Sequence, residues 1–268
     1  MKTWFVTGAS RGFGRELTEQ LLARGDRVAA TLRDPARLDD LAAAHGDRLW
    51  RAALDVTDTE RLRTVVDAAF ADLGRVDVVV SNAGSGVFGA AEELTDAQIE
   101  SLIATNLTSS IQLARAALPH LRARRGGLLL QVSSMGAQIA FPGFSLYHVS
   151  KWGIEGFYES LAQEVGPFGI ATMLVEPGMI RTSFYESAEH APPHPAYEHL
   201  HGPRVAVEDM PGDQELVVAA MISAADRDDP PRRLVLGSDA HRLMTDALRA
   251  RLAEVDAQRD TAARTDRW

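Results

Sequence analysis

The chain has 268 residues, a formal net charge of −9 at pH 7 and a pI of about 5.4. This acidity argues against a nucleic-acid partner or an anionic membrane surface. There is no cysteine in the sequence, which excludes disulfides, thiolate metal sites and cysteine nucleophiles.

The N-terminus runs from Met1 directly into an apolar strand at residues 4–7, which leaves no room for a signal peptide. No apolar run approaches the length of a membrane-spanning helix. We therefore expect a soluble, cytoplasmic protein without a membrane partner. A chain of this length can bury the core of one large α/β domain.

A glycine-rich turn follows this first strand, with the sequence Gly8-Ala9-Ser10-Arg11-Gly12-Phe13-Gly14. A helix is predicted to continue from the turn to about residue 24. Strand, turn and helix in this order form half of a mononucleotide-binding unit, in which glycines let backbone N–H groups approach a pyrophosphate. Tight packing also selects glycine, so the turn alone is weak evidence, but its position favours a nucleotide site.

The second predicted strand, residues 27–32, ends in Arg33-Asp34-Pro35. An acid at this strand end binds ribose hydroxyls in proteins that select NAD, whereas a nearby arginine suits the extra phosphate of NADP. Arg33 lies in this region and Arg11 lies in the glycine turn opposite. We therefore expect NADP(H) as the preferred cofactor, with NAD(H) possible, although Asp34 is either a ribose ligand or a helix cap.

Helices and strands then alternate, which predicts parallel strands joined by right-handed crossovers. Helices are expected at residues 36–45 and from Thr57 or Asp58 to about 73, and strands at 49–54 and 76–80. The third strand ends in Asp55-Val56 and the fourth in Ser81-Asn82-Ala83-Gly84. Ala83 and Gly84 are small enough to admit a flat ligand, or they simply form a turn. Residues 85–89 are predicted to be a loop beside the substrate.

One long helix is predicted over residues 96–118 from apolar residues that recur at helical spacing. Asn106 lies in the middle of this helix, and asparagine is a mediocre helix former. Taken alone, it is interpreted as a tolerated polar residue. The residues expected to face inward are Ile99, Ile103, Leu107, Ile111, Ala114 and Leu118.

The segment from residue 133 to 151 combines three side chains suited to proton transfer. Ser134 follows a predicted strand at 127–132, and a helix begins near Ser145 with Val149, Trp152, Phe157, Leu161 and Val165 at helical spacing. Tyr147 and Lys151 are i and i+4 on one face of that helix. A phenol titrates near ~10, and a lysine ammonium nearby lowers its pKa towards neutrality. A serine hydroxyl can hydrogen-bond a carbonyl oxygen on which charge develops. The alternative is a surface tyrosine–lysine pair and a turn serine.

Gly153 and Gly156 on the same helix suggest close packing and a subunit interface.

The last third of the chain adds a strand at 170–175, a helix at 214–225, a strand at 233–236 and a helical tail over 240–268, with Leu243, Leu248 and Leu252 spaced to pack. Residues 183–212, rich in proline, histidine and aromatic residues, break the rhythm and are predicted to be a substrate lid. His190, His194, His199 and His201 are too irregularly spaced to favour a metal site.

The alternation of strands and helices predicts one doubly wound, Rossmann-like α/β domain over residues 1–268, with about seven parallel strands and helices on both faces.

These segments together resemble the short-chain dehydrogenase/reductase family over nearly the whole chain. One departure is Ser81, where the family usually has a first asparagine before Asn82. The matching pieces are Thr7 to Gly14 of the glycine turn, Asp55-Val56, Asn82-Ala83-Gly84, Asn106, Ser134 with Tyr147 and Lys151, and Pro177-Gly178-Met179-Ile180-Arg181-Thr182.

The resemblance implies a role for each matching residue. Tyr147 would be the general acid in reduction and the base in oxidation, with Lys151 lowering its pKa and holding the nicotinamide ribose. Ser134 would polarise the substrate oxygen, and Asn106 would bind a water that relays protons to Lys151. The cofactor would be held by Gly8, Ser10, Arg11, Gly12, Phe13, Gly14, Arg33, Asp55, Val56, Asn82, Ala83, Gly84, Pro177, Gly178, Ile180 and Thr182.

We therefore expect a homodimeric or homotetrameric NADP(H)-preferring oxidoreductase that interconverts a hydrophobic secondary alcohol and its ketone. The apolar residues expected around the substrate are Phe88, Ile139, Phe141, Phe144, Met179, Phe184 and Tyr185. Two alternatives stay open, a non-catalytic redox sensor that binds NADP(H), and an epimerase or dehydratase that retains its cofactor.

Overall fold

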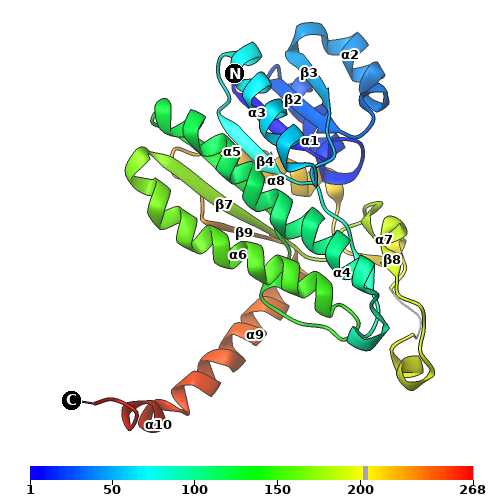
Figure 1. Cartoon of the computed structure of the whole chain (residues 1–268), viewed down its shortest axis with the longest axis vertical. Coiled ribbons are helices and arrows are strands. Elements are labelled where there is room, and N and C mark those ends of the chain that lie inside the picture. Colours follow the sequence, from blue (N-terminus) through cyan, green and yellow to red (C-terminus); the bar gives the residue numbers. More distant parts are fainter. Residues whose placement is uncertain (202–204, 268) are drawn as a thin grey trace.

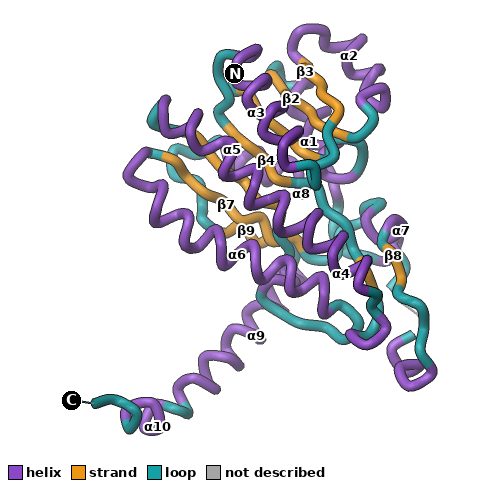
Figure 2. The backbone as a smooth tube through the Cα atoms, in the orientation of Figure 1, coloured by secondary structure: helices purple, strands orange, loops and turns teal. Residues whose placement is uncertain are grey.

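Seven parallel strands form one sheet in the computed structural model, which describes residues 1–201 and 205–267 (Figures 1 and 2). Residues 202–204 of the predicted lid and Trp268 of the predicted tail lie outside the described residues. The predicted single-domain, doubly wound fold is confirmed. In spatial order the strands are β3 (Leu49–Ala53), β2 (Arg27–Leu32), β1 (Thr3–Thr7), β4 (Val78–Ser81), β6 (Gly127–Val132), β7 (Ile170–Pro177) and β9 (Arg233–Leu236).

Two apolar cores lie on opposite faces of the sheet, because successive side chains of a strand point to opposite faces. In β1, Trp4 and Val6 belong to one core, whereas Phe5 belongs to the other. The first core is covered by α1 (Gly12–Ala23), α2 (Asp39–His45) and α8 (Gln214–Ala225). The second is covered by α3 (Thr59–Leu73), α5 (Ser109–Ala123) and α6 (Ser145–Val165) (Figure 1).

The strand order reverses between β1 and β4. Trp4 of β1 pairs with Val28 of β2 on one side and with Val78 of β4 on the other. The chain first adds strands outward to β3, then returns past β1 and adds the remaining strands on the other side. The loops at the carboxyl ends of β1 and β4 therefore diverge and leave a crevice, the usual ligand position in this architecture.

The predicted helix over residues 96–118 is instead two helices joined by a wider turn. α4 (Asp96–Ile103) and α5 flank a five-residue π-helical turn, Ala104–Thr108. Ile99, predicted to face inward, is 38% exposed, and Leu102 is buried in its place. The extra residue of a π turn rotates the face of α4 against that of α5 by about 100°.

α6 begins at Ser145 and buries Leu161 and Val165 as predicted, but two other residues predicted to face the core are exposed. Val149 is 56% exposed, and Trp152 is 42% exposed. Trp152 lies outside the core and has two other contacts. Its ring packs under the guanidinium of Arg251, which is 4.7 Å from the ring centroid, and its indole N–H donates to the Ile139 carbonyl at 3.4 Å. The buried positions of α6 include Leu146, Ile154, Tyr158, Leu161 and Val165.

The region predicted as a loop at 85–89 contains a short strand, β5 (Val87–Phe88). It pairs in parallel with β8 (Glu189–His190), which follows the short helix α7 (Phe184–Ser187) in the predicted lid. Farther along the lid, the buried Glu93 carboxylate accepts hydrogen bonds from the backbone N–H of His194 and from the His201 ring, both at 2.7 Å. The described part of 183–212 is therefore tied to the chain before α4 at two places.

The C-terminal tail is mostly one helix, α9 (Ser238–Asp256), followed by α10 (Arg259–Ala263). Ala240 and Met244 pack with Met135 and Ile139, and then α9 runs away from the body (Figure 1). The prediction that Leu248 and Leu252 pack inward is wrong, since they are 48% and 62% exposed. At this point α9 contacts the domain through Arg251, which binds Trp152 and the Gln138 carbonyl, while the two leucines stay exposed. Within residues 1–201 and 205–267, no helix is long and apolar enough to cross a membrane.

Candidate active site

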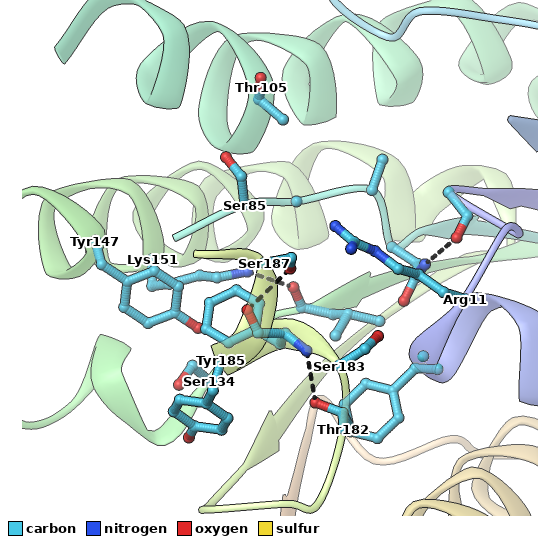
Figure 3. Close-up of a pocket in the computed structure, with 18 of the residues that line it drawn as sticks. Arg11, Ser85, Thr105, Ser134, Tyr147, Lys151, Thr182, Ser183, Tyr185 and Ser187 are labelled. Atoms are coloured by element: carbon cyan, nitrogen blue, oxygen red, sulfur yellow. Dashed lines mark hydrogen bonds between the residues drawn. The ribbon is translucent and has the colours of Figure 1, made fainter. Parts of the chain in front are cut away.

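A cavity of about 540 Å³ opens at the carboxyl ends of the strands, where the strand order reverses (Figure 3). It brings together residues that lie far apart in the sequence, from the glycine turn after β1 to the segment after β7. The predicted site residues that line it are Gly8, Ser10, Arg11, Gly12, Phe13, Arg33, Asp55, Val56, Asn82, Ala83, Gly84, Ser134, Tyr147, Lys151, Pro177, Gly178, Ile180 and Thr182.

Two predicted site residues, Gly14 and Asn106, do not line the cavity but support its walls. A Cβ on Gly14 would meet the Gly8 carbonyl and stand 2.5 Å from the Asn82 side-chain nitrogen, so glycine is required there by packing. The Asn106 side chain binds both the N–H and the carbonyl of Ser85 at 2.9 Å and donates to the Ser150 hydroxyl at 3.2 Å. It fixes the loop after β4 against α6, while the water relay through it stays a prediction.

Tyr147 is a neutral phenol in this structure. The residue is half-buried and lines the cavity. Burial raises the pKa of Tyr147 above that of a free phenol, a hydrogen bond with Ser134 opposes the rise, and nearby Tyr185 adds to it. Burial is thus the main influence on this pKa, and the lowering of it by Lys151 stays a prediction.

Lys151 lies beside Tyr147, with its ammonium nitrogen 5.6 Å from the centroid of the phenol ring (Figure 3). This nitrogen donates a hydrogen bond to the Val132 carbonyl at the end of β6, at 2.9 Å. Burial lowers the pKa of Lys151 to about 8, and the negative charge of Glu155 opposes that shift. Lys151 is thus held at the end of β6, beside the ring of Tyr147. Its ammonium can lose a proton at a pH not far above neutrality.

The two serines after β6 have different surroundings. The Ser134 oxygen accepts a hydrogen bond from the Gly136 backbone N–H at 3.0 Å, which fixes it at the start of a short 3₁₀ turn within hydrogen-bond reach of Tyr147. The Ser133 hydroxyl instead donates to the Glu155 carboxylate at 2.5 Å. Ser133 is committed to the interior, which is consistent with the choice of Ser134 from the sequence.

His148 is a site residue that sequence reasoning missed. Its Nδ1 lies 2.7 Å from the Gly136 carbonyl, and its Nε2 accepts from the Phe141 backbone N–H at 2.9 Å. Burial lowers the pKa of His148, so its ring is neutral, and the two contacts fix the segment between β6 and α6. Its position directly after Tyr147 placed it close to the predicted site. Its two partners are backbone groups, however, and the sequence does not reveal such contacts.

The wall on the substrate side is aromatic, although its membership differs from the prediction. Phe141, Phe144, Phe184 and Tyr185 line the cavity, and the rings of Tyr147 and Phe184 are 5.7 Å apart. The other three residues predicted for this wall, Phe88, Ile139 and Met179, lie behind it. Phe88 packs on Phe144, whereas Ile139 and Met179 pack under α9.

The glycine turn has the shape that a pyrophosphate requires. Gly12 has φ +55° and nothing within 4 Å of the place where a Cβ would stand, whereas Gly8 has φ +71° and would place a Cβ 2.8 Å from Ala83. The first turn of α1 carries no acidic residue, so the positive end of the helix dipole faces the cavity without a competing charge. The residues present therefore fit a dinucleotide.

Two arginines lie at the far end of the cavity from Tyr147. The guanidinium groups of Arg11 and Arg33 make no hydrogen bond or ion pair with any side chain among residues 1–201 and 205–267. Asp34 does not line the cavity, and its carboxylate accepts from the Ala36 backbone N–H at 3.1 Å as a helix cap. Asp55 accepts from the N–H and hydroxyl of Thr57, which lowers the pKa of Asp55.

The lid histidines are used in other ways. His201 pairs with Glu93, and His194 accepts the Ala196 backbone N–H at 3.2 Å through its own ring. No group of three or more potential metal ligands occurs in the part of the chain that the structure describes.

A doubly wound parallel sheet with this cavity at the switch point defines a dinucleotide-binding α/β protein. A family profile described as short chain dehydrogenase matches residues 2–192. The chain is 36% identical over 249 residues to Oxidoreductase BOA17 of Botryotinia fuckeliana (strain B05.10), covering 89% of this chain and 90% of that one. The chain therefore belongs to the short-chain dehydrogenase/reductase family and is an oxidoreductase of that family.

Solved structures agree with this assignment. A short-chain dehydrogenase from Streptomyces avermitilis superposes with a TM-score of 0.92 at 41% identity, over 99% of this chain and 100% of that one. An alcohol dehydrogenase from the archaeon Thermococcus sibiricus, complexed with 5-hydroxy-NADP, superposes with a TM-score of 0.75 at 26% identity, over 88% and 96%. The first of these similarities includes the C-terminal helices, which the family profile does not reach.

Proposed function

We propose that this protein is an NADPH-dependent reductase that interconverts a hydrophobic ketone and its secondary alcohol. The observation that carries the proposal is one cavity with Ser134, Tyr147 and Lys151 together at one end. At the other end lie Arg11 and Arg33, which have no side-chain hydrogen bond or ion pair among residues 1–201 and 205–267. The first group suits proton transfer to a carbonyl oxygen. The second suits the additional phosphate that distinguishes NADP from NAD.

When bound, the nicotinamide cofactor supplies or accepts the hydride. Tyr147, a neutral phenol, then donates its proton to the substrate oxygen as negative charge develops there. The Ser134 hydroxyl, oriented by the Gly136 N–H, donates a hydrogen bond to the same oxygen. The ammonium of Lys151 stabilises the phenolate that Tyr147 becomes, and in alcohol oxidation the same groups act in reverse.

The cofactor-binding roles are part of this proposal. The backbone of Gly8, Ser10, Gly12 and Phe13 would meet the pyrophosphate at the start of α1, and Asp55, Val56, Asn82, Ala83 and Gly84 would line the adenosine half. Pro177, Gly178, Ile180 and Thr182 would meet the nicotinamide half, beside Tyr147 and Lys151. Every one of these residues lines the same cavity.

The substrate class follows from the aromatic wall. Phe141, Phe144, Phe184 and Tyr185 present ring faces and edges, which favour an apolar or ring-containing substrate over a small charged keto acid. The predicted lid supplies Phe184 and Tyr185, and its pairing to β5 holds them over Tyr147. The homodimer or homotetramer expected through α6 stays a prediction, favoured by exposed Val149 and open space above Gly156.

The test is the nicotinamide absorbance of purified protein mixed with hydrophobic ketones, with NADPH and NADH in separate reactions. We expect NADPH to be oxidised only when a ketone is present, and pyruvate to be a poor substrate. Tyr147→Phe should lower this turnover by roughly 10²- to 10⁴-fold while NADPH still binds. Tight NADPH binding without turnover on any ketone would contradict the reductase and favour a redox sensor. Turnover without net cofactor consumption would favour an epimerase or dehydratase.

A further inference from the structure

Two buried glutamates share Arg233 as a partner, one of them a helical turn below Lys151, and the proposed reaction does not use them. Glu155 is one helical turn after Lys151 on α6, and Glu176 is the penultimate residue of β7. They are 3% and 0% exposed. Carboxylates are seldom so deeply buried unless they are paired, because desolvation of a charge is costly.

Glu155 is bound by three donors from three different segments. Its Oε1 accepts from the Ser133 hydroxyl at 2.5 Å, and its Oε2 accepts from the Gln138 amide at 2.6 Å and from Arg233 of β9. Ser133 directly follows Val132, whose carbonyl holds the Lys151 ammonium. The anchors of the ammonium and of the carboxylate are therefore consecutive residues of one strand end.

Glu176 has fewer partners. Its Oε1 accepts from Arg233 at 2.6 Å and lies 3.4 Å from the Gln138 amide, while its Oε2 is buried with no partner among the described residues. An ionised carboxylate would leave that second oxygen charged and unsolvated. A protonated one requires much less compensation.

The charges around the pair do not balance if both glutamates are ionised. Arg233 also binds Glu159 at 2.7 Å, and Glu159 in turn binds Arg232 at 2.8 Å. One guanidinium is thus shared by three carboxylates, two of them buried. Burial raises the pKa of Glu176 to about 7, the charge of Glu155 adds to the rise, and Arg233 opposes it.

Other charged groups near the pair are few. From α6, Lys151 faces Tyr147 on one side and Glu155 on the other. From α9, Arg251 binds the Gln138 carbonyl and stacks on Trp152. Gln138 and Ser133 are neutral donors.

We propose that Glu155 is a positioning residue that keeps Lys151 protonated by holding a negative charge one helical turn below it, while Glu176 keeps the proton that the two glutamates share. This inference rests on the proposed function in one respect, which is that the Lys151 ammonium stabilises the Tyr147 phenolate during the reaction. We assign the negative charge to Glu155 because three donors bind its carboxylate. Glu176 is assigned the proton because its Oε2 has no hydrogen-bond partner among the described residues.

The chain offers a direct way to measure this charge, because Lys2 and Lys151 are its only lysines. Protein labelled with ¹³C-lysine should give two Cε resonances in NMR, and Lys2→Arg assigns them. Titration of the Lys151 resonance then reports its protonation without substrate or cofactor. The Lys2 resonance, from a residue held by Asp226 and the Ala225 carbonyl, is the internal reference.

Three variants separate charge from structure. Glu155→Gln should lower the titration midpoint of Lys151 by about one pH unit, a tenfold weaker proton affinity, since an opposite charge nearby is lost. Glu155→Asp keeps the charge and should retain most of the wild-type midpoint. Glu159→Gln removes another carboxylate from Arg233, one turn farther along α6 and 44% exposed, and should leave the midpoint unchanged.

Three outcomes would overturn the inference. If Glu155→Gln leaves the Lys151 midpoint at its wild-type value in folded protein, Glu155 does not set the charge. If Glu155→Asp shifts the midpoint as far as Glu155→Gln, packing and not charge is responsible. Glu176→Gln should shift it less than Glu155→Gln, and the reverse order would place the shared proton on Glu155. A shift in the expected order without ketone-dependent NADPH oxidation would refute the proposed function and leave this inference standing.

Discussion

At one end of the cavity, which we call the tyrosine end, Ser134, Tyr147 and Lys151 are held by surrounding groups. Lys151 is bound by a strand-end carbonyl, Ser134 by a backbone N–H, and burial shifts the pKa values of both Tyr147 and Lys151. At the other end, the arginine end, Arg11 and Arg33 are exposed, and their guanidinium groups have no side-chain hydrogen bond or ion pair within the described chain. The tyrosine end is organised in advance, whereas the arginine end is free to bind an anion.

This difference follows from the chemistry that each end is proposed to perform. Proton transfer depends on short, fixed distances and on pKa values that only a water-poor site can shift. Recognition of a phosphate at the surface needs charge and a flexible reach, and an arginine already paired with a carboxylate would have to break that pair first. Substitutions at the two ends should therefore affect different measurements.

The largest effect is expected for Tyr147→Phe, which removes the proposed proton donor and leaves the ring. Turnover of the best ketone should fall by roughly 10²- to 10⁴-fold, while the Kd for NADPH, measured by fluorescence titration, changes little. Tyr158→Phe is the matched control, because it removes a buried hydroxyl from the same helix outside the cavity. Equal losses in the two variants would mean that Tyr147 contributes packing and not chemistry.

The pH profile should show the charge of Lys151. Its folded pKa of about 8 lies below that of a free lysine, so the ammonium is present at low pH and is lost as pH rises through 8. We expect the ketone-reduction rate to be level below this value and to fall up to tenfold for each unit above it. The measurement is kcat/KM from pH 6 to 10, and a rate that stays level to pH 10 would contradict the prediction.

Glycine substitutions compare the cradle with an unrelated turn. Gly12→Ala and Gly74→Ala, the second at the end of α3, introduce a Cβ at positive φ, +55° and +69°, each with nothing within 4 Å. Both should destabilise the fold by about 1 kcal/mol, because a Cβ disfavours the left-handed conformation. Only Gly12→Ala should weaken NADPH binding, by roughly tenfold, since its Cβ enters the cavity. Thermal unfolding and NADPH titration distinguish the two effects, and equal NADPH affinities would rule out a pyrophosphate at Gly12.

Arg33→Ala should weaken NADPH binding by roughly tenfold and leave NADH binding nearly unchanged, as expected for the loss of one charged contact to a phosphate. Its control is Arg63→Ala, an exposed arginine of α3 that contacts Gln112 at 3.3 Å and lies outside the cavity. Parallel titrations with the two cofactors give the ratio. A ratio unchanged by Arg33→Ala would remove this residue from the NADP site.

The smallest effect is expected at the lid. Glu93 has a pKa of about 2, lowered chiefly by the His194 backbone N–H, with burial opposing, so it is ionised throughout the working range. Glu93→Gln should weaken its contacts with His194 and His201 and raise the KM for ketone a few-fold, with the NADPH affinity unchanged. Glu92→Gln, which removes the partner of the Tyr197 hydroxyl at 2.7 Å, is the exposed control.

The sequence by itself determined the order of strands and helices, the strand-end positions of Ser134 and the glycine turn, and the shared helical face of Tyr147 and Lys151. These features depend on local patterns, since period 2, period 3.6 and glycine spacing are properties of neighbouring residues. They were sufficient to place the site at the switch point of a doubly wound sheet.

Only the tertiary structure decided what depends on segments far apart in the chain. The π turn rotated α4, the pairing of β5 with β8 tied the lid, and burial raised the pKa of Tyr147. The three donors of Glu155 come from the end of β6, the segment after it and β9. No local pattern contains such a contact, because its free energy arises from desolvation in a core that many segments form together.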